Sequence, residues 1–107
     1  MRGSHLGELE ELVLLAVFGL GADAYAVSVQ QRIESGARRA VSIGAVYSAL
    51  ERLERKGFLA SRLGEPTPDR GGRRKRHYRI NQAGREEIER VRGAREAMWR
   101  LARHHDV

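Results

Sequence analysis

Residues 42–62 read SIGAVYSALERLERKGFLASR, and they contain a change of hydrophobic period on which the fold depends. In the first part, apolar residues recur at spacings of three, four and three, as on one face of a helix: Ile43, Val46, Leu50 and Leu53. Ser42 is a good N-cap for this helix, and Gly57 is a common C-terminal stop. From Phe58 on, the helical spacing ends. The pattern predicts a helix over about 43–56 that leads directly into a strand.

Two further helices are predicted before this one. Residues 8–20 have helical spacing of apolar residues on so broad a face that most of the helix must be buried, partly against a second subunit. A second helix is predicted over about 25–34, with Asp23 as its N-cap. Residues 1–7, MRGSHLG, are expected to form a flexible lead.

The remainder of the chain predicts a β-hairpin and a last helix. Residues 58–63 and 74–80 resemble short strands, and the loop between them, GEPTPDRGGR, holds both prolines and three glycines, as in a mobile hairpin tip. A final helix capped by Asn81 follows. Three helices and a hairpin are the order of a winged helix-turn-helix. We therefore expect a mainly α protein with that domain at 8–80 and a C-terminal dimerisation helix at 81–107.

The positive charge of the chain is concentrated in the predicted hairpin. The net charge is +6, and residues 58–80 hold seven basic and two acidic side chains, whereas residues 1–57 are neutral. The densest cluster is Arg73, Arg74, Lys75 and Arg76. Four adjacent cations repel one another unless a polyanion is near, so this cluster indicates contact with a DNA backbone. The alternative is a solvated charged loop.

The predicted helix over 43–56 has a second face, opposite its apolar stripe, that suits a DNA groove. Its first half is small, which allows close approach to bases and phosphates, and its second half is cationic. The DNA-contacting residues expected here are Ser42, Gly44, Ala45, Tyr47, Ser48 and Arg52. Tyr47 stands at the margin of this face, where it either reaches a phosphate or belongs to the edge of the core.

Four segments resemble the PadR family of bacterial transcriptional regulators, over roughly residues 6–103. They are LGELEELVLLAVFGL, YAVSVQQRIE, SIGAVYSALERLERKGFLASR and GRRKRHYRINQAGREEIE. The third is the most specific, with a small residue, Tyr, two spaced Leu residues and Lys-Gly in the family order. The resemblance implies a DNA-binding dimer, commonly a repressor relieved by a small molecule. Two departures are Ser48, where the family often has Pro, and a longer hairpin, so the operator sequence cannot be carried over. The identity of the effector cannot be carried over either, because it varies widely within the family.

The resemblance also implies roles for the C-terminal helix. Family members dimerise mainly through it, and in some relatives an aromatic residue there lines a flat drug-binding pore. The residues expected at the dimer interface or effector site are Ile88, Val91, Met98 and Trp99. Trp99 either stacks on a small aromatic effector or only fills the dimer core.

Other classes of function find little support in the sequence. Cysteine is absent, and no phosphate-binding glycine loop, nucleophile elbow or metal-ligand spacing is present, so no enzyme activity, cofactor or metal is expected. No apolar run is long enough to span a membrane, which favours a soluble, cytoplasmic protein. The resemblance to bacterial regulators implies association with the nucleoid. The leading expectation is a sequence-specific regulator bound to double-stranded DNA. The alternatives are an RNA-binding basic winged helix and a winged helix that binds an acidic protein.

Overall fold

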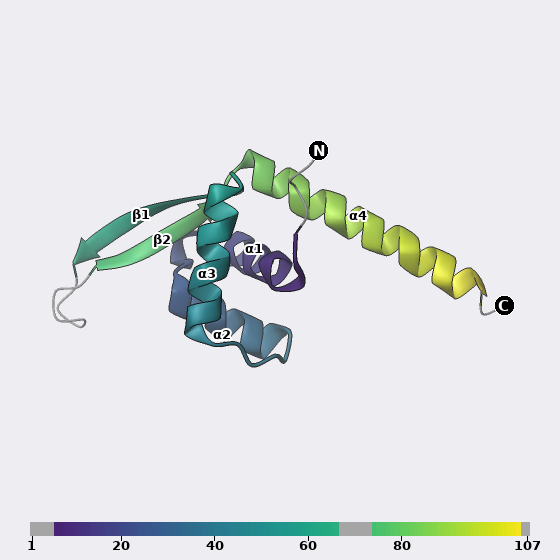
Figure 1. Cartoon of the computed structure of the whole chain (residues 1–107), viewed down its shortest axis with the longest axis horizontal. Coiled ribbons are helices and arrows are strands. Elements are labelled where there is room, and N and C mark those ends of the chain that lie inside the picture. The colour runs from purple at the N-terminus through teal and green to yellow at the C-terminus, as the bar shows by residue number, and fades with distance from the viewer. Residues whose placement is uncertain (1–5, 67–73, 106–107) are drawn as a thin grey trace.

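The computed structural model describes residues 6–66 and 74–105, which fold into four helices, one short 3-10 turn and a two-stranded hairpin. In chain order they are α1 (Glu8–Leu20), η1 (Gly21–Asp23), α2 (Ala26–Gly36), α3 (Ile43–Arg55), β1 (Leu59–Pro66), β2 (Arg74–Ile80) and α4 (Gln82–His105). Figure 1 shows α1, α2 and α3 as a central body, with the hairpin extending from one side and α4 from the other. This is a winged helix-turn-helix with a long C-terminal helix, as the sequence predicts.

The core lies between the three helices of the body and the base of the hairpin. It forms because each helix has an apolar stripe that can be buried only against the others. The largest fully buried side chains are Leu14, Leu50, Leu53, Val13, Val17, Val29 and Val46. The stripe predicted from residues 42–62 therefore faces inward, and the opposite face of α3 is left to solvent.

Helix boundaries agree with the sequence at α3 and differ at α2. The Oγ atom of Ser42 accepts a hydrogen bond from the Ala45 amide at 3.0 Å, which confirms the predicted N-cap. The predicted Asp23 cap is wrong, because Asp23 ends η1 and the N-cap of α2 is Tyr25. The hydroxyl of Ser28 accepts from the Tyr25 amide at 3.0 Å and donates to the Asp23 carbonyl, and so supplies the cap from within the helix.

The hairpin is antiparallel, and its first strand is longer than predicted. Leu59 pairs with Ile80 and Leu63 with Arg76, after which the register shifts before Pro66. Gly64–Pro66, expected in the loop, belong to β1, because Pro66 still pairs with Arg74 beyond the register shift. The Arg74 Nε also donates to the Gly64 carbonyl at 2.9 Å. The rest of the predicted loop lies outside the described residues.

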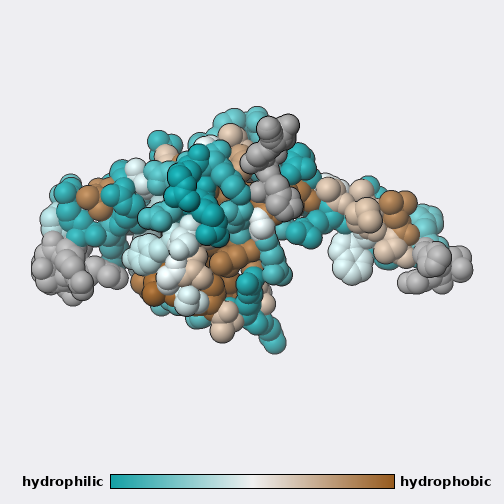
Figure 2. Space-filling view, in the orientation of Figure 1, coloured by the Kyte–Doolittle hydropathy of each residue, from teal (hydrophilic) through white to brown (hydrophobic). Residues whose placement is uncertain are grey.

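Helix α4 begins against the base of the hairpin and then leaves the body. The Gly84 amide donates to the Asn81 side chain at 2.9 Å, which confirms the predicted cap. A Cβ at Gly84 would lie 2.4 Å from the Phe58 carbonyl oxygen, so only glycine allows the helix to start this close. The distal part of α4 carries exposed apolar surface away from the body (Figure 2). No helix in the described part of the chain is long and apolar enough to cross a membrane.

Candidate nucleic-acid interface

The first half of α3 presents a small, exposed surface. Ser42, Gly44 and Ser48 are exposed and Ala45 is half-buried. Tyr47 is 49% exposed, so it is a surface residue and not the edge of the core. A Cβ at Gly44 would meet no atom within 4 Å, so packing within the protomer does not require glycine there. The structure therefore brings together the small residues that the sequence assigned to a DNA-facing surface.

The second half of α3 is tied to α1. The Arg52 Nε lies 2.9 Å from Glu10 Oε2, and the Lys56 Nζ lies 2.8 Å from Glu10 Oε1. The Gly7 amide also donates to Glu10 Oε1, at 2.9 Å. Burial alone would raise the pKa of the Glu10 carboxyl, but the hydrogen bonds from Lys56, Gly7 and Arg52 outweigh it and lower the pKa to about 2. The guanidinium that the sequence assigned to DNA is therefore engaged in an ion pair inside the protomer.

Sequence reasoning missed Glu10, because three acids in one first turn suggest only a favourable interaction with the helix dipole. A usable signal was nevertheless present. Glu10 lies three residues before Val13 and four before Leu14, which places it on the buried face of α1. Its side chain is 7% exposed, and an acid on such a face requires a cationic partner from another element.

The hairpin carries the other cationic group, which we name the wing cations: Arg74, Lys75 and Arg76. Arg74 and Arg76 are exposed and Lys75 is half-buried. Each is held by the fold: Arg74 by the Gly64 carbonyl, Arg76 by the Ser61 hydroxyl at 3.1 Å, and Lys75 by the Tyr25 ring, whose centroid is 3.9 Å from Nζ. Arg73, also predicted to contact DNA, lies outside the described residues.

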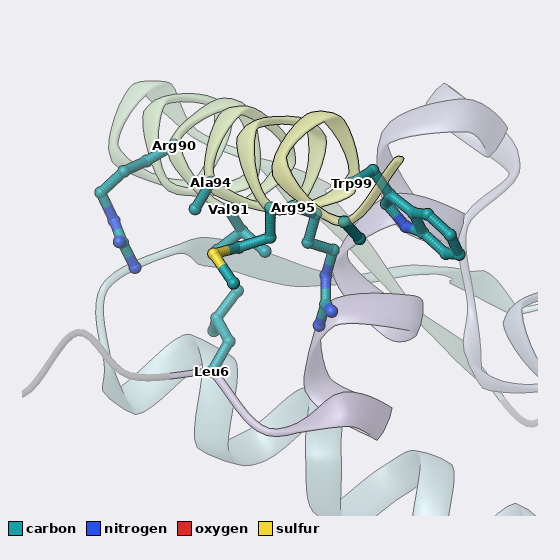
Figure 3. A pocket seen from close by; sticks show the side chains of 8 residues that line it. Leu6, Arg90, Val91, Ala94, Arg95 and Trp99 are labelled. Atoms are coloured by element: carbon teal, nitrogen blue, oxygen red, sulfur yellow. The ribbon is translucent and has the colours of Figure 1, made fainter. Parts of the chain in front are cut away.

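A second surface lies under α4. A groove of about 550 Å³ is lined by Leu6, Arg90, Val91, Ala94, Arg95, Met98, Trp99 and Ala102. In Figure 3, Leu6 reaches toward α4 from below, and the side chains of Arg90 and Arg95 descend on either side of it. Arg95 is fixed by Glu11 of α1, with 3.0 Å between Nε and Oε2. Leu6 and Arg95 thus join the start of α1 to the groove.

The residues predicted for a dimer or effector site are not equally available. Met98 and Trp99 are 64% and 63% exposed, and Leu101 beside them is 64% exposed. Val91 is half-buried in the groove. Ile88 is only 6% exposed, because it packs into the core of the protomer. The exposed set therefore lies in the distal half of α4.

The described residues do not form a metal centre. Within residues 6–66 and 74–105, no three His, Cys, Asp or Glu side chains lie close enough together to hold a metal ion. The site is instead made of small residues, hydroxyls and cations on a helix and a neighbouring hairpin. This combination defines a winged helix-turn-helix protein built to meet a polyanion.

Comparison with known proteins identifies the family. Residues 14–90 match the model of the transcriptional regulator PadR-like family. Because the match covers more than half of the chain, the chain belongs to this family. The family consists of transcriptional regulators and not of enzymes, and membership implies DNA binding. No curated protein matches the chain in sequence.

Solved structures show the same fold at low identity. A PadR-like transcription factor from Bacteroides fragilis superposes with a TM-score of 0.76 at 23% identity, covering 90% of this chain and 87% of that one. A PadR family regulator from Clostridium difficile R20291 gives a TM-score of 0.71 at 16% identity, with 94% and 100% covered. A PadR-like regulator from Bacillus cereus gives 0.69 at 17%, with 90% and 88% covered.

Proposed function

We propose that this chain is a sequence-specific repressor that binds double-stranded operator DNA as a homodimer in the cytoplasm. The observation that carries the proposal is the exposed, small first half of α3 beside the wing cations. In this arrangement Ser42, Gly44 and Ser48, which are exposed, and the half-buried Ala45 enter the major groove, and Tyr47 lies at its edge. The wing cations, with Arg73, contact the phosphate backbone.

The wing cations and α3 have different roles in DNA binding. Contacts to phosphate supply affinity and its salt dependence, whereas contacts to base edges supply sequence preference. Gly44 supports this division, since glycine favours a helix less than Ala does and no atom of the protomer needs the space. A duplex that approaches the helix closely does need it.

Selection of bound fragments from genomic DNA tests the proposal. We expect recovery of a common site with two related half-sites about 34 Å apart, one for each α3 of the dimer. A reporter gene placed behind that site should be transcribed less when the protein is present. Equal binding to duplex DNA and structured RNA would favour an RNA-binding module, and binding that survives nuclease treatment would favour an acidic protein partner.

The dimer is supported by the apolar surface of α4 and α1. Met98, Trp99 and Leu101 project from a helix that has left the body, and α1 exposes Leu15 and Phe18. Exposed apolar surface of this kind, rimmed by polar residues, is typical of an interface between proteins. We expect sedimentation to give the dimer mass at micromolar concentration, and Trp99→Glu to give the monomer. A monomer mass for the wild type would show that the proposed homodimer is wrong.

The effector is proposed to be a small planar aromatic compound bound at Trp99. A ligand releases DNA only if it prefers the arrangement of the dimer that does not bind DNA. Titration with phenolic and cationic aromatic compounds, followed by Trp99 fluorescence and DNA affinity together, tests this proposal. A compound that releases DNA without changing Trp99 emission would place the effector site elsewhere.

A further inference from the structure

A hollow of about 350 Å³ lies where α2, α3 and the hairpin meet. The residues that line it come from all three elements: Tyr25, Ala26, Val27, Tyr47, Arg74, Lys75 and Arg76. It therefore contains the three wing cations and the one exposed tyrosine of α3. The first turn of α2, to which the sequence assigned no function, forms its remaining wall.

Tertiary contacts fix the walls of this hollow. The Tyr78 amide of β2 donates to the Ala24 carbonyl at 2.9 Å, which ties the hairpin to the residue just before Tyr25. The Tyr25 ring then packs edge-on against His77, at 5.9 Å between ring centroids. On this ring rests the Lys75 ammonium, at 3.9 Å from the centroid, so the lysine is positioned by a cation–π contact.

The chemistry of the lining matches an anion with several oxygens. Three of the lining residues are cationic and, among the residues described as lining the hollow, none is acidic. Arg74 and Arg76 each use one N–H group within the hairpin, and a guanidinium has five. The hydroxyl of Tyr47 adds a neutral donor on the α3 wall. The first turn of α2 adds the positive end of a helix dipole, which strengthens the field without defining the site.

We propose that this hollow holds one phosphodiester group of the bound DNA, held jointly by α2, α3 and the hairpin. The inference rests on the proposed DNA binding and adds a location to it. A phosphate held from three elements fixes the depth and angle at which α3 enters the groove. Lys75 and Tyr47 are then positioning residues for recognition, and Tyr25 positions Lys75.

Lys75→Gln compared with Arg79→Gln tests the site. Both variants remove one positive charge from β2, but Arg79 lines a different hollow, with Gly21 and Ala22. Binding of a short random-sequence duplex is measured by fluorescence anisotropy over a range of salt concentrations. We expect Lys75→Gln to flatten the log–log salt slope by about one, as for one lost phosphate contact, and Arg79→Gln to leave it nearly unchanged. Lys75→Arg should restore the slope.

Two further measurements separate the alternatives. Tyr47→Phe should weaken binding a few-fold with an unchanged salt slope, because the lost hydrogen-bond donor is neutral. Inorganic phosphate, added at constant ionic strength, should compete with the duplex for the hollow and therefore weaken binding by the wild type more than binding by Lys75→Gln. Equal weakening of both would overturn the proposal. Equal effects of Lys75→Gln and Arg79→Gln would also overturn it and leave DNA binding intact. Failure of the wild type to bind any duplex would instead overturn the proposed function itself.

Discussion

Two groups of Arg and Lys residues lie in segments that the sequence assigns to DNA binding, but the side chains around the two groups differ. Arg52 and Lys56 of α3 converge on one buried carboxylate, that of Glu10. The wing cations of the hairpin have carbonyl, hydroxyl and aromatic partners, and within residues 6–66 and 74–105 none of them forms an ion pair. The comparison shows that the position of a basic residue on the DNA-facing helix of such a domain is not enough to predict that it contacts DNA. Its nearest acid decides whether the charge stabilises the fold or remains available to a ligand.

The largest expected effect concerns the wing cations. Neutralising Arg73 together with Arg74, Lys75 and Arg76 should flatten the salt slope of DNA binding by about three to four and lower affinity at 0.1 M salt by up to about a thousandfold. Fluorescence anisotropy on a duplex recovered by genomic selection measures both quantities. The matched control is Arg52→Gln with Lys56→Gln, which removes the two cations paired with Glu10. Because the carboxylate balances only one of the two charges, we expect the control slope to flatten by at most about one. A control slope that flattens as much as the wing slope would break the comparison.

The next largest effect is on stability. Glu10→Gln leaves two cations without their carboxylate and should lower the free energy of unfolding at pH 7 by about 3 kcal/mol, since the pKa of Glu10 lies about 2.5 units below its ordinary value. Because the folded-state pKa is depressed, this contribution is complete above about pH 4.5. It disappears as the pH falls toward 2. Urea unfolding followed by circular dichroism should therefore show wild type and variant converging across that window.

Glu11→Gln is the control for that experiment. Glu11 pairs with Arg95, whose side chain is 60% exposed, so the pair is screened by solvent and its loss should cost clearly less than the loss of the Glu10 pair. A loss as large as that of Glu10→Gln would show that burial does not distinguish the two pairs.

The smallest effect separates folding from recognition on α3 itself. Gly44→Ala and Gly93→Ala both add a methyl group in a helix where nothing lies within 4 Å. Gly93→Ala, in the interior of α4, should stabilise the fold by about 0.5–1 kcal/mol, and Gly44→Ala, in the first turn of α3, by less. Only Gly44→Ala should also weaken DNA binding, because only Gly44 belongs to the surface proposed to approach the duplex. Thermal unfolding and anisotropy on the same samples measure both changes. If Gly44→Ala binds DNA as tightly as the wild type, the duplex does not approach the first half of α3 closely.

Hydrophobic period, capping residues and charge density were sufficient to predict the element order, because each of these signals is local. The stripe ending at Leu53, the cap at Ser42 and the strand at 74–80 appear in the structure as predicted. The misplaced cap at Asp23 shows the limit, since the serine that caps α2 lies inside the helix. Ile88 shows the same limit, because the spacing of apolar residues on α4 does not tell whether Ile88 faces the protomer core or a partner; in the structure it packs into the core.

From local patterns alone, the chain could be recognised as three helices, a basic hairpin and a C-terminal helix. What only the tertiary structure decided was the use of each charge. Glu10 meets Arg52 across 42 positions of sequence, and Lys75 meets Tyr25 across the junction of hairpin and α2. Such contacts depend on how the helices and the hairpin pack. A difference of a few ångströms between a cation and a carboxylate decides whether the cation forms an ion pair or stays available to a ligand. Periodicity along the chain contains no information on distances of that kind.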